Sequence, residues 1–247
     1  MKRDKSCSIT GINGFLGSAL NKHLLSMGWK TYPTLRPDVG YLFLFGSPSS
    51  NHWFNYALSY SLKETIDNFI NAADYCQRYN IKLIYPSSGT TSEGKTPYSK
   101  CKLILDILGN IYAKNILGLR IFSAYGENEG HKEEYASIVY LFTKAMKEGK
   151  SPIIWGDGKQ TRDFIYIDDI IDNIIKYKDK EGIIDIGTGV NRSFNEVVDI
   201  INKKLQTKIK PVYRKRPELY IEHTICKKPC KYKISLEEGV QKMIDSL

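Results

Sequence analysis

The sequence has no long apolar run. No stretch of the 247 residues approaches the roughly 20 consecutive apolar residues that a membrane-spanning helix requires. The first residues, 1–5, are mostly charged and lead into an apolar strand instead of an apolar signal segment. We therefore expect a protein without a membrane partner that resides in the cytoplasm.

Paired cysteines and grouped histidines are also missing. The five cysteines are scattered along the chain, and the four histidines are isolated from them. Zinc sites in proteins combine closely spaced cysteines with each other or with histidines, and such spacing is absent here. The sequence predicts reduced thiols and no metal site.

Charge is not concentrated in any one tract. The formal net charge is +9, but lysines are spread over the whole chain. Dispersed positive charge is typical of a solvated surface, whereas nucleic-acid-binding proteins gather it on one face. We expect no nucleic-acid partner, and a small anionic substrate is compatible with this charge.

A glycine-rich turn stands near the start of the chain. Gly11, Gly14 and Gly17 follow an apolar strand that ends near Ile9, and a helical pattern opens directly after them. Such a turn lets the backbone approach a pyrophosphate and aims the N–H groups of the helix N-terminus at it. The alternative is a turn that uses glycine for its geometry alone. The predicted cofactor contacts of this turn are Gly11, Asn13, Gly14, Phe15, Leu16 and Gly17.

Arg36 follows the second predicted strand, at about residues 30–35. In dinucleotide-binding folds the residue after this strand faces the adenosine ribose. An arginine can bind a 2′-phosphate there with its guanidinium fork. This favours NADP(H) over NAD(H), unless Arg36 is a surface residue that points away.

Strands and helices then alternate along the chain. Helical patterns are predicted at about 57–79 and from Pro97 onward, and strands at about 41–45, 81–85 and 116–122. This order predicts an α/β fold with a doubly wound parallel sheet. We expect residues 1–125, with 163–189 returning to them, to form a dinucleotide-binding domain. Residues 126–162 and 190–247 would form a smaller substrate-binding part.

Tyr98, Lys102 and Ser88 form the clearest catalytic pattern. Thr96 and Pro97 predict a helix start that places Tyr98 and Lys102 one turn apart, and Ser88 follows the preceding strand. A tyrosine holds its proton until about pH 10. A nearby ammonium and an oxidised nicotinamide favour the phenolate, and Ser88 can hold a substrate oxygen beside the phenol. The plainer alternative is a surface tyrosine beside a solvated lysine.

These motifs together resemble an extended short-chain dehydrogenase/reductase of the NAD-dependent epimerase/dehydratase family, which acts on nucleotide sugars. The matching segments occur in family order at residues 10–17, 46–48, 87–88, 98–102, 120–126, 156–169 and 185–189. The resemblance implies that Tyr98 is the acid/base, that Lys102 binds the nicotinamide ribose and that Ser88 orients the substrate.

The same resemblance implies the remaining binding residues. Further cofactor contacts would be Gly46, Ser47 and Ser87, and substrate contacts would be Ser88, Thr90, Ser123, Arg162 and Arg216. Arg162 would bind the nucleotide diphosphate, unless it forms an ion pair with Asp163 or Asp157. Arg216 resembles a second phosphate contact.

The chain also departs from the family. One strand–helix unit is missing before residues 41–45, and the loop from Ser88 to Tyr98 is short. Gly89 and Thr90 stand where dehydratases carry an acidic residue. The leading hypothesis is therefore reduction of a 4-keto nucleotide sugar, with a 4-epimerase that retains NAD and a non-catalytic dinucleotide sensor as alternatives. Helices near 57–79 and 97–114 predict a homodimer, as in the family.

Overall fold

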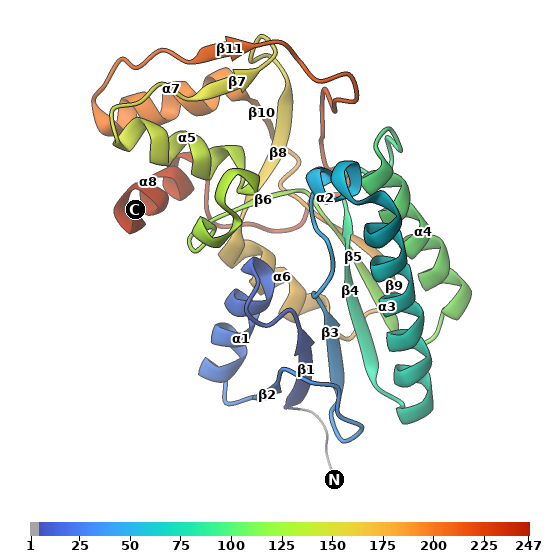
Figure 1. Ribbon diagram of the computed structural model, residues 1–247. Coiled ribbons are helices and arrows are strands. Elements are labelled where there is room, and N and C mark those ends of the chain that lie inside the picture. Colours follow the sequence, from blue (N-terminus) through green and yellow to red (C-terminus); the bar gives the residue numbers. More distant parts are fainter. Residues whose placement is uncertain (1–4) are drawn as a thin grey trace. The chain divides into compact units, whose positions relative to one another are not determined.

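The computed structural model describes residues 5–247, which fall into two compact units (Figure 1). Unit 1 comprises the described residues up to Ile121 together with Ile171–Ile184. Unit 2 comprises Phe122–Ile170 and Asp185–Leu247. Each unit has its own sheet and helices, and each is described separately below.

Unit 1 is built around a six-stranded sheet with the strand order β2-β1-β3-β4-β5-β9. Its elements are β1 (Ser6–Thr10), α1 (Phe15–Ser26), β2 (Lys30–Tyr32), β3 (Tyr41–Leu44), α2 (Asn51–Tyr56), α3 (Leu58–Tyr79), β4 (Lys82–Ser88), α4 (Pro97–Tyr112), β5 (Ile116–Ile121), α6 (Ile167–Tyr177) and β9 (Gly182–Ile186). Neighbours from β2 through β5 run parallel. Thr10 at the end of β1 pairs with Leu44 at the end of β3, so the turns after both strands start side by side.

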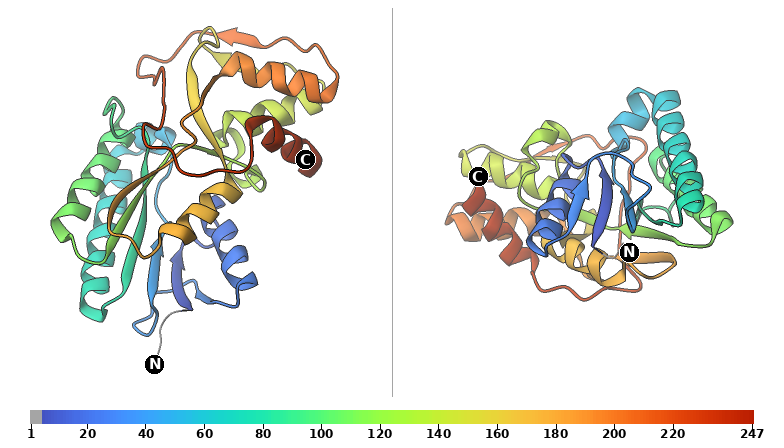
Figure 2. Two further views of the ribbon diagram at one scale, coloured as in Figure 1. Left: turned by 180° about the vertical axis from the view of Figure 1, so that it is seen from behind. Right: turned by 90° about the horizontal axis from the view of Figure 1, so that it is seen from below.

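The chain winds the sheet in both directions from β1. The connection through α1 leads to β2 on one side of β1, whereas the connection through α3 leads from β3 to β4 on the other side. Right-handed crossovers in opposite directions place their helices on opposite faces of the sheet. Figures 1 and 2 show α1 on one side of the strands and α3 with α4 on the other. The predicted doubly wound α/β fold is confirmed.

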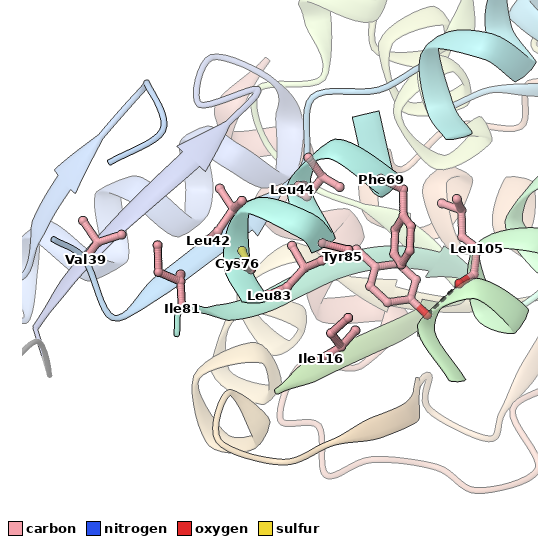
Figure 3. Packing of buried hydrophobic residues seen from close by; sticks show 12 residues of the cluster. Val39, Leu42, Leu44, Phe69, Cys76, Ile81, Leu83, Tyr85, Leu105 and Ile116 are labelled. Atoms are coloured by element: carbon pink, nitrogen blue, oxygen red, sulfur yellow. Dashed lines mark hydrogen bonds between the residues drawn. The ribbon is translucent and has the colours of Figure 1, made fainter. Parts of the chain in front are cut away.

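The core of unit 1 lies between the sheet and α3 with α4 (Figure 3). Tyr85 of β4 is fully buried and meets the Phe69 ring of α3 edge-on, with ring centroids 4.9 Å apart. Its hydroxyl donates to the Leu105 carbonyl at 3.2 Å. A methyl carbon added to Gly109 or Gly118 would lie 2.5 Å from this hydroxyl oxygen. The two glycines therefore make the space that the tyrosine fills.

The link between β2 and β3 is short and contains no helix, as the sequence indicates. The strand predicted at 30–35 ends at Tyr32 because Pro33 has no N–H to donate to the ladder. Val39 joins the core, and the Gly40 N–H donates to the Ser6 carbonyl at 3.1 Å. The chain thus passes from one side of β1 to the other and pairs again at the amino end of β1.

Two helices of unit 1 begin where the sequence predicts. The helix expected at 57–79 is α3, Leu58–Tyr79, and a short helix that was not predicted, α2, precedes it; the φ of −133° at Ala57 is not helical and separates the two. Helix α4 begins as predicted: Thr96 accepts from the Ser99 N–H, and the Ser99 side chain accepts from the Thr96 N–H. This capping box fixes the first turn, which carries Tyr98.

Unit 2 contains a three-stranded and a two-stranded sheet with flanking helices. Its elements are β6 (Ser123–Tyr125), the 3₁₀ helix η1 (Gly130–Tyr135), α5 (Ile138–Lys147), β7 (Ile153–Trp155), β8 (Thr161–Tyr166), β10 (Asn191–Ser193), α7 (Phe194–Leu205), β11 (Val212–Arg214) and α8 (Leu236–Ser246). Strand β8 pairs antiparallel with β10 and parallel with β6, and β11 runs parallel to β7. Of residues 163–189, which were expected to return to the first domain, 171–184 lie in unit 1, whereas 163–170 and 185–189 lie in unit 2.

Asp163 organises the interior of unit 2. Its carboxylate accepts from the backbone N–H groups of Thr188, Gly189 and Cys226 at 2.8 to 2.9 Å, and from the Thr188 hydroxyl at 2.7 Å. The carboxylate is fully buried, so these donors replace the water that it gives up on folding. Two loops distant in sequence are thereby fixed to the middle of β8.

No helix in the described part of the chain is long and apolar enough to cross a membrane. Likewise, residues 5–247 contain no group of three or more histidine, cysteine or acidic side chains arranged to hold a metal ion.

Replacing Gly118 with alanine is expected to destabilise the protein by about 1–3 kcal/mol, because the new methyl group overpacks the core against Tyr85. The measurement is urea-induced unfolding of the variant and the parent protein. In a Tyr85→Phe background the same substitution should cost less, because the nearest clashing atom is gone. An equal cost in both backgrounds would contradict the predicted clash.

Candidate active site

The glycine turn after β1 is packed so closely that side chains are excluded from it. A Cβ added to Gly17 would lie 2.1 Å from the Gly11 carbonyl oxygen, and one added to Gly11 would lie 2.7 Å from the Gly46 nitrogen. Gly11 also has a φ of +66°, which favours glycine. The turns after β1 and β3 therefore touch through their backbones at the carboxyl edge of the sheet.

Thr10 ties these two turns together. Its hydroxyl accepts from the Gly46 N–H at 3.1 Å and donates to the Phe43 carbonyl at 3.5 Å. Thr10 belongs to the glycine motif at residues 10–17, but no role was predicted for it. Its signal is a small hydroxyl residue at the last position of the first strand.

The N-terminus of α1 can receive an anion. Its cap, Gly14, has no side chain to accept hydrogen bonds from the first turn, and that turn contains no acidic residue. The partial positive charge of the helix end is therefore not neutralised by α1 itself. Asn13 is exposed, Leu16 is half-buried and Phe15 is buried in the core. A cradle of glycines at a helix N-terminus fits the pyrophosphate of a dinucleotide.

Arg36 lies in a different environment from the one expected. Its guanidinium forms a two-point ion pair with Asp38 at 2.9 and 3.0 Å and stacks on the Tyr32 ring at 4.5 Å. Asp38 holds the pKa of Arg36 above its ordinary value. The Gly40 N–H donates to the Ser6 carbonyl at the amino end of β1. The Arg36–Asp38 ion pair therefore lies in the chain segment that runs to the amino end of β1.

Ser88, Tyr98 and Lys102 lie close together, as their positions in the sequence predict. The Ser88 side chain at the end of β4 is near enough to the Tyr98 phenol to lower its pKa. The Lys102 ammonium lies 5.7 Å from the centre of the Tyr98 ring and donates to the Pro86 carbonyl at 3.2 Å. Two residues of one helix face thus meet the end of the neighbouring strand.

Burial shifts the two titratable groups in opposite directions. Partial burial raises the pKa of Tyr98 to about 12, while the nearby Ser88 side chain lowers it. The same cause lowers the pKa of Lys102 to about 8. The expected lowering of the Tyr98 pKa is therefore not present in the protein alone, since burial disfavours the charged phenolate more than Ser88 favours it.

Hydroxyl groups surround this position. Ser88 Oγ and Thr90 Oγ1 lie 2.9 Å apart, and the Thr90 N–H donates to Ser88 Oγ at 3.2 Å. Ser87 Oγ and Thr91 Oγ1 are buried without a hydrogen-bond partner among residues 5–247. A buried hydroxyl without a partner is costly, so a ligand that supplies one fits this site. Ser47, in the loop after β3, is half-buried.

In unit 2, Arg162 binds backbone. Its guanidinium donates to the carbonyls of Thr161, Glu222 and Ile221 at 2.7 to 3.2 Å. It also stacks between the rings of Phe194 and Tyr220, 5.4 and 5.5 Å from their centres. The Arg162 side chain thus connects the segment around residue 221 to β8 through hydrogen bonds to the backbone.

Arg216 is held by two carboxylates. Its guanidinium is paired with Glu222 and lies 3.6 Å from Asp157. It also lies over the Tyr220 ring, 5.6 Å from the ring centre. The nearby Gln160 is buried, and its Oε1 atom has no partner among the described residues. Ser123 lies at the start of β6, half-buried and paired with Phe164 of β8. Ser123, Arg162 and Arg216 thus all lie in unit 2, on or beside its three-stranded sheet.

A sequence profile and a sequence relative point to the same protein family. The sequence profile described as "NAD dependent epimerase/dehydratase family" matches residues 33–187. A protein of Methanocaldococcus jannaschii, provisionally named a UDP-glucose 4-epimerase, is 30% identical over 203 residues. That match covers 71% of this chain and 66% of the relative.

Solved structures share the fold. The UDP-glucose 4-epimerase of Thermotoga maritima, determined with UDP-glucose, has a TM-score of 0.87 at 20% identity, and the similarity covers 98% of each chain. The UDP-N-acetylglucosamine 4-epimerase of Methanobrevibacter ruminantium has a TM-score of 0.86 at 22% identity, covering 100% of each chain. At these identities the similarity establishes the fold.

Replacing Gly17 with alanine is expected to weaken dinucleotide binding at least tenfold, because a Cβ there cannot coexist with the Gly11 carbonyl and the turn must move. Isothermal titration with NAD measures the effect. Ser18→Ala is the matched control, because Ser18 lies in the same turn of α1 and its hydroxyl only donates to the Phe15 carbonyl. Unchanged affinity in a folded Gly17→Ala protein would rule out this turn as the binding site.

Proposed function

Because the chain belongs to the NAD dependent epimerase/dehydratase family, we propose that it is an NAD-dependent 4-epimerase of a UDP-linked hexose. The family predicted from the motifs is confirmed. The relative that is 30% identical carries a UDP-glucose 4-epimerase name, which supports epimerisation over reduction of a keto sugar. The nucleotide and the sugar are part of the proposal.

The observation that carries this proposal is the contact of Ser88 with Tyr98, beside Lys102. In epimerisation Tyr98 would accept a proton from the sugar hydroxyl and return it after the keto sugar has rotated to present its opposite face. Ser88 would hold the same sugar oxygen near the phenol. NAD, when bound, supplies the hydride acceptor and donor for the carbon that bears this oxygen. Because a tyrosine and a serine suffice for the proton transfer, the lack of an acidic residue at Gly89 and Thr90 is no obstacle.

The glycine turn, Gly46, Ser47, Ser87 and Lys102 would hold the cofactor. The preference for NADP(H) depends on Arg36 binding a 2′-phosphate. That guanidinium is already paired with Asp38 and stacked on Tyr32. A phosphate would have to displace a two-point ion pair, which supports NAD as the cofactor.

The residues of unit 2 would bind the nucleotide part of the substrate. We propose that Arg216 reaches the diphosphate by exchanging Glu222 and Asp157 for phosphate oxygens, because each of these carboxylates contacts the guanidinium at a single point, whereas phosphate can bind it at two. Arg162 would act by holding the backbone near Tyr220 in place, with Ser123 and Thr90 as lesser substrate contacts.

Reduction of a 4-keto nucleotide sugar by NADPH is the second candidate function. It requires the same Tyr98 proton, and the open link between β2 and β3 favours exchange of the cofactor at each turnover. A non-catalytic dinucleotide sensor is a third.

All five cysteines are buried and unpaired, which supports a reducing, cytoplasmic location.

Replacing Tyr98 with phenylalanine should lower kcat by about 10²- to 10⁴-fold with little change in KM, because the proton carrier is lost and the ring remains. The measurement is conversion of UDP-glucose to UDP-galactose with NAD. Tyr60→Phe, an exposed tyrosine of α3, is the control and should retain full activity.

The same assay separates the candidate functions. Interconversion of UDP-hexoses without net loss of a reduced cofactor supports the epimerase. Oxidation of NADPH by 4-keto nucleotide sugars, without interconversion, would replace it with the reductase. Ligand binding that survives in Tyr98→Phe, together with no turnover of either kind by the parent protein, would indicate a sensor.

We also propose that α4 forms a homodimer contact with a second copy of this chain. Four apolar side chains are exposed along one side of this helix, namely Leu103, Ile104, Ile107 and Ile111. They recur every three or four residues, and Ile111 is 71% exposed. A stripe of this kind is typical of a surface that packs against another helix.

Replacing Ile107 with glutamate should convert a dimer to a monomer, because a charge would be buried in the proposed contact. Light scattering during gel filtration measures the mass. Leu25→Glu, which alters an exposed leucine of α1, should leave the mass unchanged. A parent protein that is monomeric at micromolar concentration would contradict the proposed contact.

A further inference from the structure

Helix α2 presents one side chain to the interior. Phe54 is 1% exposed, whereas its neighbours Trp53 and Tyr56 are 45% and 79% exposed. The helix is attached to the start of α3, because the Trp53 carbonyl accepts from the Ser61 hydroxyl at 3.0 Å and from the Ala57 N–H at 2.8 Å. Ser61 is itself fully buried. A short helix that would be unstable alone is thereby fixed with Phe54 pointing inward.

The Phe54 ring packs directly against the Tyr98 ring. Their centroids are 5.5 Å apart and the planes are inclined at 73°, an edge-to-face arrangement. Such pairs stabilise a fold by more than the burial of their surface alone would, and they fix the orientation of both rings. The Tyr98 side chain therefore has Ser88 near its phenol and Phe54 packed against its ring.

We propose that Phe54 is a positioning residue for the reaction: it holds the Tyr98 phenol against Ser88 and excludes water from the ring. This inference rests on the proposed function, in which Tyr98 carries the proton. Phe54 itself touches neither the sugar nor the cofactor in this account and acts only through Tyr98.

Water exclusion decides when Tyr98 loses its proton. The groups that face the phenol are Ser88 from β4 and Cys101 and Lys102 from α4, while α2 contributes Phe54, which carries no charge. Burial is the largest cause of the raised Tyr98 pKa, and the Cys101 thiol adds to it. Phe54 therefore keeps the phenol protonated until a positive charge is bound beside it.

The test is a titration of Tyr98 in the protein without ligands. Phenolate absorbance is recorded against pH, and the same titration of a matched protein with Tyr98→Phe is subtracted to remove the other 16 of the 17 tyrosines. In Phe54→Ala the pKa of Tyr98 should fall from about 12 by one unit or more, toward the ~10 of a solvated tyrosine. Phe54→Leu, which keeps an apolar side chain, should restore most of the shift.

Kinetics provide a second readout. Phe54→Ala should lower kcat on the order of tenfold with little change in KM, because the phenol is displaced while the substrate contacts remain. Trp53→Leu is the control on the same helix and should change neither the pKa nor kcat. If Phe54→Ala does not fold, the Tyr98 pKa and kcat are measured in Phe54→Leu and Phe54→Met. Both quantities should then shift in the same direction by smaller amounts.

The outcomes separate this inference from the proposed function. An unchanged Tyr98 pKa in folded Phe54 variants, or an equal fall in Trp53→Leu, would overturn the positioning role. A lowered pKa in a protein that converts no nucleotide sugar would leave the role of Phe54 intact and refute the proposed function alone.

Discussion

Two turns of unit 1 lie against each other only because neither has a side chain at the point of contact. Gly11 and Gly46 approach so closely that a Cβ on either would lie within 3 Å of the other turn. The Thr10 hydroxyl then locks the contact by accepting from the Gly46 N–H. Everything that would bind a dinucleotide depends on this contact, because it brings the ends of β1 and β3 to one edge and leaves the N-terminus of α1 accessible.

Much of unit 1 could be predicted because its signals are local. The glycines after β1, the helix-start residues Thr96 and Pro97, and the apolar runs of β3 to β5 each act within a few residues of chain. The same is true of Tyr98 and Lys102, whose spacing is that of one helical turn. Ser88 could be placed near them because it follows the strand predicted directly before their helix.

Features that depend on tertiary contacts could not be predicted. Arg36 was expected to face a ribose, but β2 stops at Pro33 and the guanidinium pairs with Asp38. Strands β6, β8 and β10 are short and their pairing joins segments far apart in sequence, so the sequence did not show that residues 163–170 group with unit 2. Phe54 gave no periodic signal, since α2 has only six residues. Its importance is visible only from its distance to Tyr98.

The strand β2 has a consequence for how the sheet behaves among other protein molecules. It forms one border of the six-stranded sheet and is three residues long, with Pro33 directly after it. A border this short offers very few free main-chain donors and acceptors to an approaching strand, and the proline removes one more. By shortening its edge, the chain therefore also limits the risk of polymerising through open-ended strand addition on that side.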